Sequence, residues 1–531
     1  MNVRSVAYVD KEPRLGIRRL GLGGLLRRAT GFTIKKGQAT NAVRSRCNDS
    51  IEAQIGQYFW LPTLFAAYKE SDPAETYLLQ SHPCAWDVSA RQFHRAYIAL
   101  SSAKHFWCHG GTSFIICDGT FTKTKGFRHI LLIVVAFDGN NQLVILAFAI
   151  VDVENADNWI FFKESLEADF PGIKVWMSDT DKGIKSGAFA LSMSQSEDEF
   201  ILSRCAWHLT ENCREAVKAS MPQKAKDLII ELAKARTEDV YQRCLEQLRQ
   251  LNDGWAQYMD GKKDEFASVS FLQRGHMRHG KVTSNGVETI NGSLLEARGM
   301  PIVYMIESIT QYQQEKYNER KVLAEVWLNS NKALTVYAEE QDALTGAKAS
   351  KRTVQMLELI HPNYRAKVSV GNVHNVAGYI EVSVNVEDKS RACPCLYYEE
   401  TGMNCVHVKA LLLQLGSLGT GKDWWDGRFH LDNYRSSYGA VLPSLAVAGK
   451  LSADTTFLPP DYKRPAGRPK KKRQERSHYI AAKKRECKAC GGEGHFAIAC
   501  KQPSTEYQVT KHKEAAVSWC KKHETVVIEE D

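Results

Sequence analysis

The chain has 531 residues, of which 44% are hydrophobic and 25% are charged. This composition is ordinary for a folded globular protein and excludes a mostly disordered or a collagen-like chain. At roughly 100–200 residues per domain, the length predicts three to five structural units with material for a sizeable core. No run of 18 apolar residues occurs, so the sequence predicts no membrane span.

The net charge of +9 is concentrated in two basic segments. Residues 1–46 contain 11 basic and two acidic residues, and residues 463–485 contain 11 basic and one acidic residue. Residues 486–531 have a net charge of −2, which leaves −8 for residues 47–462. Basic ends favour a polyanionic partner, most simply nucleic acid. Solvated termini are the alternative, and we prefer it for residues 1–46. The two acids in this segment argue against an organelle transit segment.

The first half of the sequence predicts an α/β fold around a mixed sheet. Helices are expected at 51–69 and 89–101. The expected strands span 113–117, 129–137, 143–151, 173–177 and 200–205. The second and third strands are joined by Asp138-Gly139-Asn140-Asn141, which is typical of a hairpin. A helix is expected at 158–166 and another between the last two strands, and this order indicates a sheet with helices packed on it.

The second half is expected to be mainly helical. Apolar stripes at helical spacing cover residues 209–270 and are most simply packing surfaces. A further helix is expected at 285–298, ended by Gly299 and Pro301. Residues 302–360 are again predicted to be helical, whereas residues 368–386 alternate as strands do.

Two acidic residues stand where expected strands end. Asp118 follows the first strand and Asp179 follows the fourth, and Glu288 lies on the helix expected after the helical region. Carboxyl ends of neighbouring strands converge in an α/β sheet, so these carboxylates could meet. Converging carboxylates repel one another unless divalent cations lie between them, and Mg²⁺ prefers such oxygen ligands. A turn or helix cap is the alternative role of an Asp at a strand end.

The sequence around these acids resembles the transposase domain of Mutator-like elements (MULE). Four motifs in the family's order carry the resemblance, which covers residues 90–310. They are CDGTFTKTKGFRHILLIVVAFDGNNQLVILAFAIVDVENADNWIFF at 117–162, MSDTDKGI at 177–184, RCAWHL at 204–209 and SNGVETINGSLLEARGMPI at 284–302. The resemblance implies an RNase H-like core of the DDE transposase type, with a helical insertion at 209–270.

The resemblance also assigns roles to residues. Asp118, Asp179 and Glu288 match the catalytic acids that hold Mg²⁺ or Mn²⁺, and Asp181 is the nearby alternative to Asp179. Cys205 and His208 match a Cys-x-x-His motif near the active site; the residues alone allow either a metal site or a buried thiol with a hydrogen-bonded histidine. The family pattern also includes three further residues, Asn291, Arg298 and Pro301.

Three other acids precede the helix expected at 158–166. We interpret Asp152, Glu154 and Asp157 as turn and helix N-terminal residues, because negative charge is favourable at that end of the helix dipole.

The chain has 14 cysteines and no apparent signal peptide, which favours metal sites over disulfides. The pattern C-x-C-x9-C-x-H provides three thiolates and one imidazole, the ligands of a closed, structural Zn²⁺ site. Its residues are Cys393, Cys395, Cys405 and His407. The pattern resembles the SWIM zinc finger, which commonly follows the transposase domain in Mutator-like proteins.

A second zinc pattern lies near the C-terminus. Its ligands, spaced C-x2-C-x4-H-x4-C, are Cys487, Cys490, His495 and Cys500. The spacing matches a CCHC zinc knuckle, a common module for single-stranded nucleic acid, and Phe496 could stack on a base. A knuckle that contacts protein is the alternative, because metal spacing fixes the fold and not the partner.

A basic segment, RPAGRPKKKR at 464–473, lies between the two zinc patterns. It resembles an AT-hook around Gly467-Arg468-Pro469, but Ala466 stands where the family usually has Arg. A minor-groove contact by Arg468 would leave the neighbouring basic side chains near phosphates. The DNA-binding residues assigned on this basis are Arg464, Gly467, Arg468, Lys470, Lys471, Lys472 and Arg473. A nuclear localisation signal is the preferred alternative, and the two roles are compatible.

The sequence therefore predicts a nuclear, metal-dependent DNA transposase with two zinc modules. We expect it to bind terminal inverted repeats and target DNA, and to act on DNA as a homo-oligomer. A transposase-derived DNA-binding regulator is the alternative, and a nuclease of the same fold is more remote. The predicted units are 1–105 (basic and helical), 106–310 (core), 311–385 (connecting region), 386–420 (SWIM finger), 463–485 (basic segment), 486–501 (knuckle) and 502–531 (tail). No recognisable DNA-binding domain precedes the core.

Overall fold

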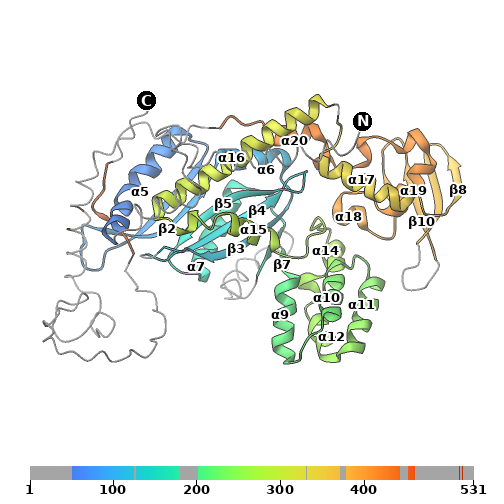
Figure 1. The fold of residues 1–531 in the computed structure, drawn as a ribbon, viewed down its shortest axis with the longest axis horizontal. Coiled ribbons are helices and arrows are strands. Elements are labelled where there is room, and N and C mark those ends of the chain that lie inside the picture. Colours follow the sequence, from blue (N-terminus) through green and yellow to red (C-terminus); the bar gives the residue numbers. More distant parts are fainter. Residues whose placement is uncertain are drawn as a thin grey trace, which may run out of the picture.

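The computed structural model describes residues 51–124, 127–179, 201–330, 332–370, 378–442 and 452–460, together with Glu514 and Val517. These residues form a mixed α/β structure with two sheets (Figure 1). Within these ranges, no helix combines the length and the apolar character needed to cross a membrane.

The larger sheet is mixed and is built around a central antiparallel meander. Its strands lie in the order β1-β2-β5-β4-β3-β6-β7, and β12 pairs with β2. The strand β4 is antiparallel to both of its neighbours, β3 and β5, whereas β6 and β7 run parallel to β3. The strand bounds are β1 Thr76–Pro83, β2 Arg91–Ala99, β3 Phe114–Phe121, β4 Ile130–Phe137, β5 Leu143–Val151, β6 Val175–Ser178, β7 Ile201–Arg204 and β12 Phe457–Leu458. The five strands expected from the sequence and the hairpin at 138–141 are confirmed.

Both faces of this sheet are covered, which explains why its central strands are apolar throughout. Alternate residues of a strand point to opposite faces. In β4, Leu131 and Ile133 face a core shared with α5, α15 and α16, while Leu132 and Val134 face a core shared with α6, α7 and α20. The covering helices are α5 Ile51–Ser71, α6 Ser101–Gly110, α7 Ala156–Asp169, α15 Asn285–Ser293, α16 Ile302–Asn329 and α20 Leu431–Ser437.

A helical insertion separates β7 from α15 and has its own core. Its helices are α9 Ala206–Val217, α10 Gln223–Lys234, α11 Glu238–Leu251, α12 Asp253–Asp260, α13 Lys263–Phe266 and α14 Ser268–Gln273. The apolar stripe of α11, which includes Cys244 and Leu248, is buried in this core. The stripe is therefore a packing surface, as expected.

The second sheet belongs to a unit that contains the first zinc pattern. Its antiparallel strands lie in the order β11-β10-β9-β8 and pack against α17 and α19. The bounds are α17 Val336–Ala349, β8 Val354–Ile360, β9 Asn363–Ser369, β10 Tyr379–Asn385, β11 Arg391–Ala392, α18 Tyr397–Thr401 and α19 Val406–Gln414. Single turns of 3₁₀ helix are η1 Ala297–Gly299, η2 Gly416–Gly419, η3 Lys422–Trp424 and η4 Gly427–Phe429.

Three local expectations were wrong. Residues 91–99 form β2 instead of part of a helix at 89–101, because this segment pairs with β1 on one side and β5 on the other. Residues 354–360 form β8, an edge strand paired with β9, instead of continuing the helical stretch. The strand β3 continues past Cys117, so Asp118 lies within it and not after it. In each case strand pairing outweighs local propensity.

Candidate active site and metal centre

Asp118 lies on β3, and Asp179 directly follows the neighbouring parallel strand β6, on the same face of the sheet. The register pairs Ile116 of β3 with Met177 of β6, so continuing both strands by two residues brings Asp118 level with Asp179. Ile116 and Met177 both belong to the core on the α15 side. Because side chains alternate along a strand, Asp118 and Asp179 are directed toward that side as well.

The helix α15 brings Glu288 to the same place. Asn291, one turn after Glu288, donates a hydrogen bond from Nδ2 to Asp118 Oδ2 at 2.8 Å. Residues three apart share one face of a helix, so the face that carries Glu288 is the face turned toward Asp118. The buried residues Val287 and Ile290 anchor this helix in the core.

His208 lies between two of the acids. Its Nε2 atom is 3.6 Å from Asp179 Oδ2 and 3.8 Å from Glu288 Oε1. Interaction with the Cys205 thiol raises the pKa of His208 to about 9, although burial opposes the shift; the charges of Asp179 and Glu288 add to it. A protonated imidazole at this position offsets the repulsion between the two carboxylates.

Cys205 is a buried thiol that joins α9 to the segment before α15. It precedes the first residue of α9, and its Sγ accepts a hydrogen bond from the backbone N–H of Ser284 at 3.2 Å. Burial raises the pKa of Cys205, but the interactions with His208 and Ser284 outweigh it, so the pKa is lowered overall. The structure thus brings Cys205 and His208 beside the acids. The role of Ser284 was missed because its contact uses a backbone N–H, which no sequence pattern marks.

Arg298 braces the end of β3 against α15. Its guanidinium donates to Thr120 Oγ1 at 2.5 Å, to the Phe121 carbonyl at 2.7 Å and to the Asn291 carbonyl at 3.1 Å. These bonds fix both elements that carry the Asp118–Asn291 contact. Arg298 therefore positions the site and does not reach into it.

As the structure describes them, the three acids do not form one tight ligand cluster. Among the residues described by the structure, they do not form a set whose ligand atoms all lie within 4.8 Å of one another. In a two-ion site, however, the ions lie about 3.5–4 Å apart, so ligands of different ions are farther from each other. Glu288 is half exposed, which leaves the site open to a substrate. Asp181 lies outside the described residues.

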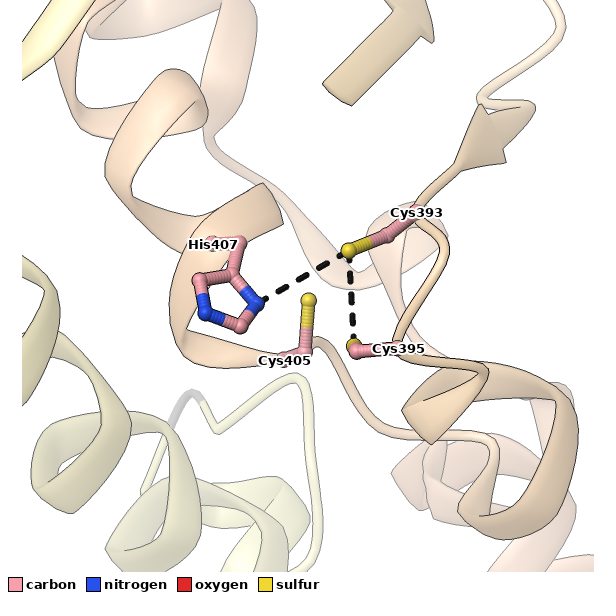
Figure 2. Close-up of side chains that lie close together, drawn as sticks. All are labelled: Cys393, Cys395, Cys405 and His407. Carbon is pink, nitrogen blue, oxygen red and sulfur yellow. Dashed lines mark hydrogen bonds between the residues drawn. The ribbon is translucent and has the colours of Figure 1, made fainter. Parts of the chain in front are cut away.

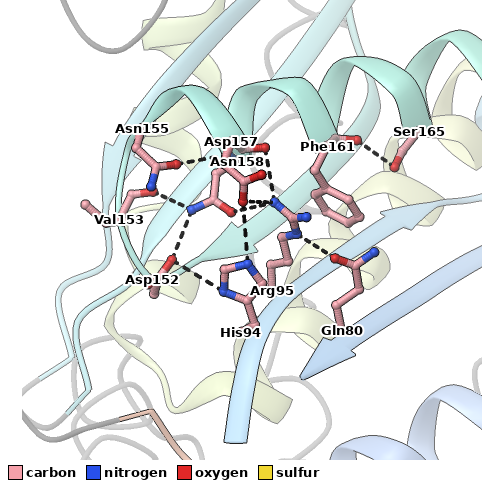
Figure 3. Close-up of polar contacts among 10 residues, drawn as sticks. All are labelled: Gln80, His94, Arg95, Asp152, Val153, Asn155, Asp157, Asn158, Phe161 and Ser165. Carbon is pink, nitrogen blue, oxygen red and sulfur yellow. Dashed lines mark hydrogen bonds and ion pairs between the residues drawn. The ribbon is translucent and has the colours of Figure 1, made fainter. Parts of the chain in front are cut away.

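Two of the rival acids, Asp152 and Asp157, have the structural roles expected of them. Asp157 lies in the first turn of α7 and is paired with Arg95 at 2.7 Å, and Asp152 accepts a hydrogen bond from Asn158 at 3.0 Å (Figure 3). Glu154 lies against the β3 backbone: a Cβ at Gly119 would be 2.7 Å from its Oε1 atom. Gly119 thus permits a close approach that a larger residue would prevent.

The first zinc pattern forms a compact cluster (Figure 2). The ligand atoms of Cys393, Cys395, Cys405 and His407 all lie within 4.8 Å of one another. Cys393 Sγ is 3.4 Å from Cys395 Sγ and 3.8 Å from His407 Nδ1. Thiolates around a tetrahedral Zn²⁺ are about 3.8 Å apart, given Zn–S bonds of about 2.3 Å. The cluster can therefore bind zinc, with no position left for a substrate.

Local structure holds these ligands in place. Cys393 follows β11, and Cys405 caps α19, where its Sγ accepts the Val408 N–H at 3.3 Å. Hydrogen bonds with Cys395 and Cys405 raise the pKa of the Cys393 thiol, and those with Cys393 and Cys405 lower the pKa of Cys395. Zinc binding would displace the protons that remain on these thiols.

The predicted knuckle ligands Cys487, Cys490, His495 and Cys500 lie outside the described residues. The same holds for the basic segment at 463–485. Both remain predictions.

Comparisons with known proteins support part of this picture. A comparison with curated proteins gave no match. Residues 114–212 match the model of the MULE transposase domain. The matched segment runs from the start of β3 into α9 and includes Asp118, Asp179, Cys205 and His208. The chain therefore contains a segment similar to a MULE transposase domain, which suggests a transposase-type function.

Proposed function

We propose that this protein is a Mutator-like DNA transposase that cleaves DNA at element ends and joins the freed ends to target DNA. One observation carries the proposal: Asn291 of α15 hydrogen-bonds to Asp118 of β3, and His208 lies 3.6 Å from Asp179 and 3.8 Å from Glu288 of α15. The order β5-β4-β3-β6-β7 supports an RNase H-like core, since a three-stranded meander is followed by two parallel strands. The MULE match over residues 114–212 supports the same reading.

In this proposal the three acids hold Mg²⁺ or Mn²⁺. Two such ions supply activation of an attacking oxygen and stabilisation of the leaving oxygen in phosphoryl transfer. The chain's own groups prepare the site. Asn291 fixes the Asp118 carboxylate, and Arg298 fixes the backbone around it. His208 holds Asp179 and Glu288 near a single ring nitrogen, Nε2.

The proposed reaction has two steps at a phosphodiester. Water attacks a phosphorus at the element end, and the broken P–O bond leaves a 3′-hydroxyl. That hydroxyl then attacks a phosphorus of target DNA, which forms a new phosphodiester and releases a strand of the target. We propose that the chain works as a homo-oligomer in the nucleus, with two Zn²⁺ ions in structural sites. The basic segment and the knuckle would then contact DNA.

The test is strand cleavage of terminal inverted repeat DNA by the full chain with Mg²⁺ or Mn²⁺. We expect cleavage by the wild type and a loss of at least about 100-fold in Glu288→Gln, which keeps the shape and removes the charge. Glu296→Gln is the matched control, since Glu296 is an exposed acid shortly after α15, and it should cleave as the wild type does.

Two results would contradict the proposal. Equal cleavage by wild type and Glu288→Gln would show that the proposed acids do not catalyse the reaction. Specific DNA binding without cleavage by the wild type would instead support a DNA-binding regulator.

A further inference from the structure

The segment that leads into α15 is held at both ends. Residues 276–284, called the strap here, connect the insertion to α15. Val282 accepts the Ala206 N–H at 2.8 Å, and Ser284 donates to Cys205 Sγ. The Ser284 carbonyl in turn accepts the Val287 N–H at 3.0 Å in the first turn of α15. The position of the strap therefore determines where α15, with Glu288, begins.

The zinc cluster lies against this strap through the loop between two of its ligands. Residues 396–404, called the zinc loop, join Cys395 to Cys405 and contain α18. Glu400 on α18 is 1% exposed and accepts a hydrogen bond from Ser268 Oγ at 3.1 Å. In Figure 1, α18 lies beside α14, and the two helices are in contact.

A buried arginine of the strap is linked to this loop through Ser268. Arg278 is fully buried and donates to the Phe266 carbonyl at 2.6 Å, the Ala233 carbonyl at 2.8 Å and Ser268 Oγ at 2.6 Å. Burial raises the pKa of Glu400, and the charge of Arg278 is the largest effect that lowers it. Ser268 thus bridges the buried cation to the buried anion. Either charge left alone at this depth would be strongly unfavourable.

Two further contacts join the loop to its surroundings. Arg428 hydrogen-bonds to the His279 ring in the strap and to the Thr401 carbonyl in the zinc loop. Arg236 of the insertion donates from Nε to the Cys395 carbonyl at 3.0 Å and lies over the Tyr397 ring. The strap also turns at Gly280, whose φ of +71° favours glycine; a Cβ at this position would lie 3.4 Å from Thr401 Cγ2.

We propose that the zinc loop is a brace of the active site: a zinc ion at the Cys393–His407 cluster fixes both ends of the loop, and Glu400 and Thr401 then hold the strap that positions Glu288. Zinc fixes this loop because binding the ion orders the chain between its ligands. In this role Glu400 and Arg428 are positioning residues. The unit that contains the zinc cluster then supports the active site. The catalytic consequence rests on the function proposed above, whereas the brace itself does not.

Hydrogen exchange of the full chain tests the brace directly. In Glu400→Gln, with zinc content measured in parallel, we expect exchange across residues 276–288 to quicken by roughly tenfold or more, the usual effect of losing a buried charged partner. Glu381→Gln is the matched control, because Glu381 is a half-exposed acid on β10 of the same unit, paired with Arg365. It should leave exchange in the strap unchanged.

Zinc removal is the second arm. Cys405→Ser should lose the ion and deprotect residues 276–288 as well as the zinc loop. If Glu400→Gln fails to fold, hydrogen exchange of Arg428→Met tests the brace instead. This change removes the contacts to His279 and Thr401 and leaves every zinc ligand in place. Unchanged exchange in the strap, in a folded Glu400→Gln or Arg428→Met or after zinc loss, would overturn the brace.

Cleavage assays separate this inference from the proposed function. Glu400→Gln should need more Mn²⁺ for half-maximal cleavage, and high Mn²⁺ should partly restore its rate, because the acids are intact but misplaced. If the wild type never cleaves DNA, the proposed function is contradicted, but the hydrogen-exchange evidence for the brace is unaffected. If Glu400→Gln needs no more Mn²⁺ than the wild type and its strap still exchanges slowly, the brace is contradicted while the proposed function stands.

Discussion

At the scale of single residues, the candidate site depends on groups that hold its acids in position. Asn291 fixes the Asp118 carboxylate, and Arg298 fixes the carbonyls and hydroxyl around it. A fixed carboxylate loses less conformational entropy when it receives a ligand. The arginine therefore matters through its planar fork of donors, which lysine lacks.

Arg298→Lys should destabilise the protein and weaken the site. A lysine ammonium cannot satisfy Thr120, Phe121 and Asn291 together, so we expect a loss of about 2–3 kcal/mol in the free energy of unfolding. Denaturant unfolding measures this loss. Arg249→Lys, at an exposed arginine of α11 paired with Glu246, should change stability by less than about 0.5 kcal/mol. Equal effects of the two changes would contradict the bracing role.

His129 should make stability depend on pH. It is buried, with its Nε2 atom hydrogen-bonded to the Tyr58 hydroxyl at 2.5 Å, and burial lowers its pKa to about 4 from an ordinary 6.5, against an opposing effect of Asp152. The folded state thus holds the neutral ring. Its contribution is complete above pH 6.5 and is lost as the pH falls toward 4, because only the unfolded chain gains the proton there.

The effect at pH 5 should be about 2 kcal/mol relative to pH 8. Denaturant unfolding of wild type and His129→Gln at both pH values isolates it from other titrating groups. The variant should show the smaller loss on acidification. Parallel losses in the two proteins would mean that His129 is not buried in its neutral form.

At the scale of elements, the site is assembled from pieces that are stabilised separately. β3 and β6 lie in a sheet covered on both faces, whereas α15 begins where the strap places it. In our proposal, zinc at the Cys393–His407 cluster would order the loop 396–404, and metal binding would then add folding free energy to that of apolar packing.

Zinc content should report the two predicted sites independently. We expect two ions per chain in the wild type, one in Cys405→Ser and one in Cys500→Ser, because each change removes a thiolate from a different closed site. Elemental analysis of the purified proteins measures this. A wild type with a single ion that Cys405→Ser eliminates would confine zinc to the cluster in Figure 2.

At the scale of the whole molecule, the features predicted correctly are those that short stretches of sequence determine. The apolar runs of β4 and β5 with the Asp-Gly turn between them identified the hairpin, and tight ligand pairs identified the zinc cluster. Asp179 was located correctly because it directly follows a strand. Matching Glu288 to the acids needed the family resemblance, since nothing local relates α15 to β3.

Other features depend on contacts between distant segments and could not be foreseen. The segment at 91–99 is a strand because β1 and β5 flank it, and its own residues are compatible with either structure. No sequence pattern marks Arg278 or Glu400 as buried, because their burial depends on the docking of α18 on the insertion. Long-range packing of this kind leaves no periodic signal in the sequence.

The most direct test of the account is the location of bound metal. Crystals of the full chain with Mn²⁺ and a terminal-repeat oligonucleotide should give two anomalous peaks, about 3.5–4 Å apart, bounded by the carboxylates of Asp118, Asp179 and Glu288. Crystals of Glu288→Gln should lose at least one of them. Manganese bound elsewhere, or no manganese at these carboxylates with DNA present, would contradict the proposed catalytic site.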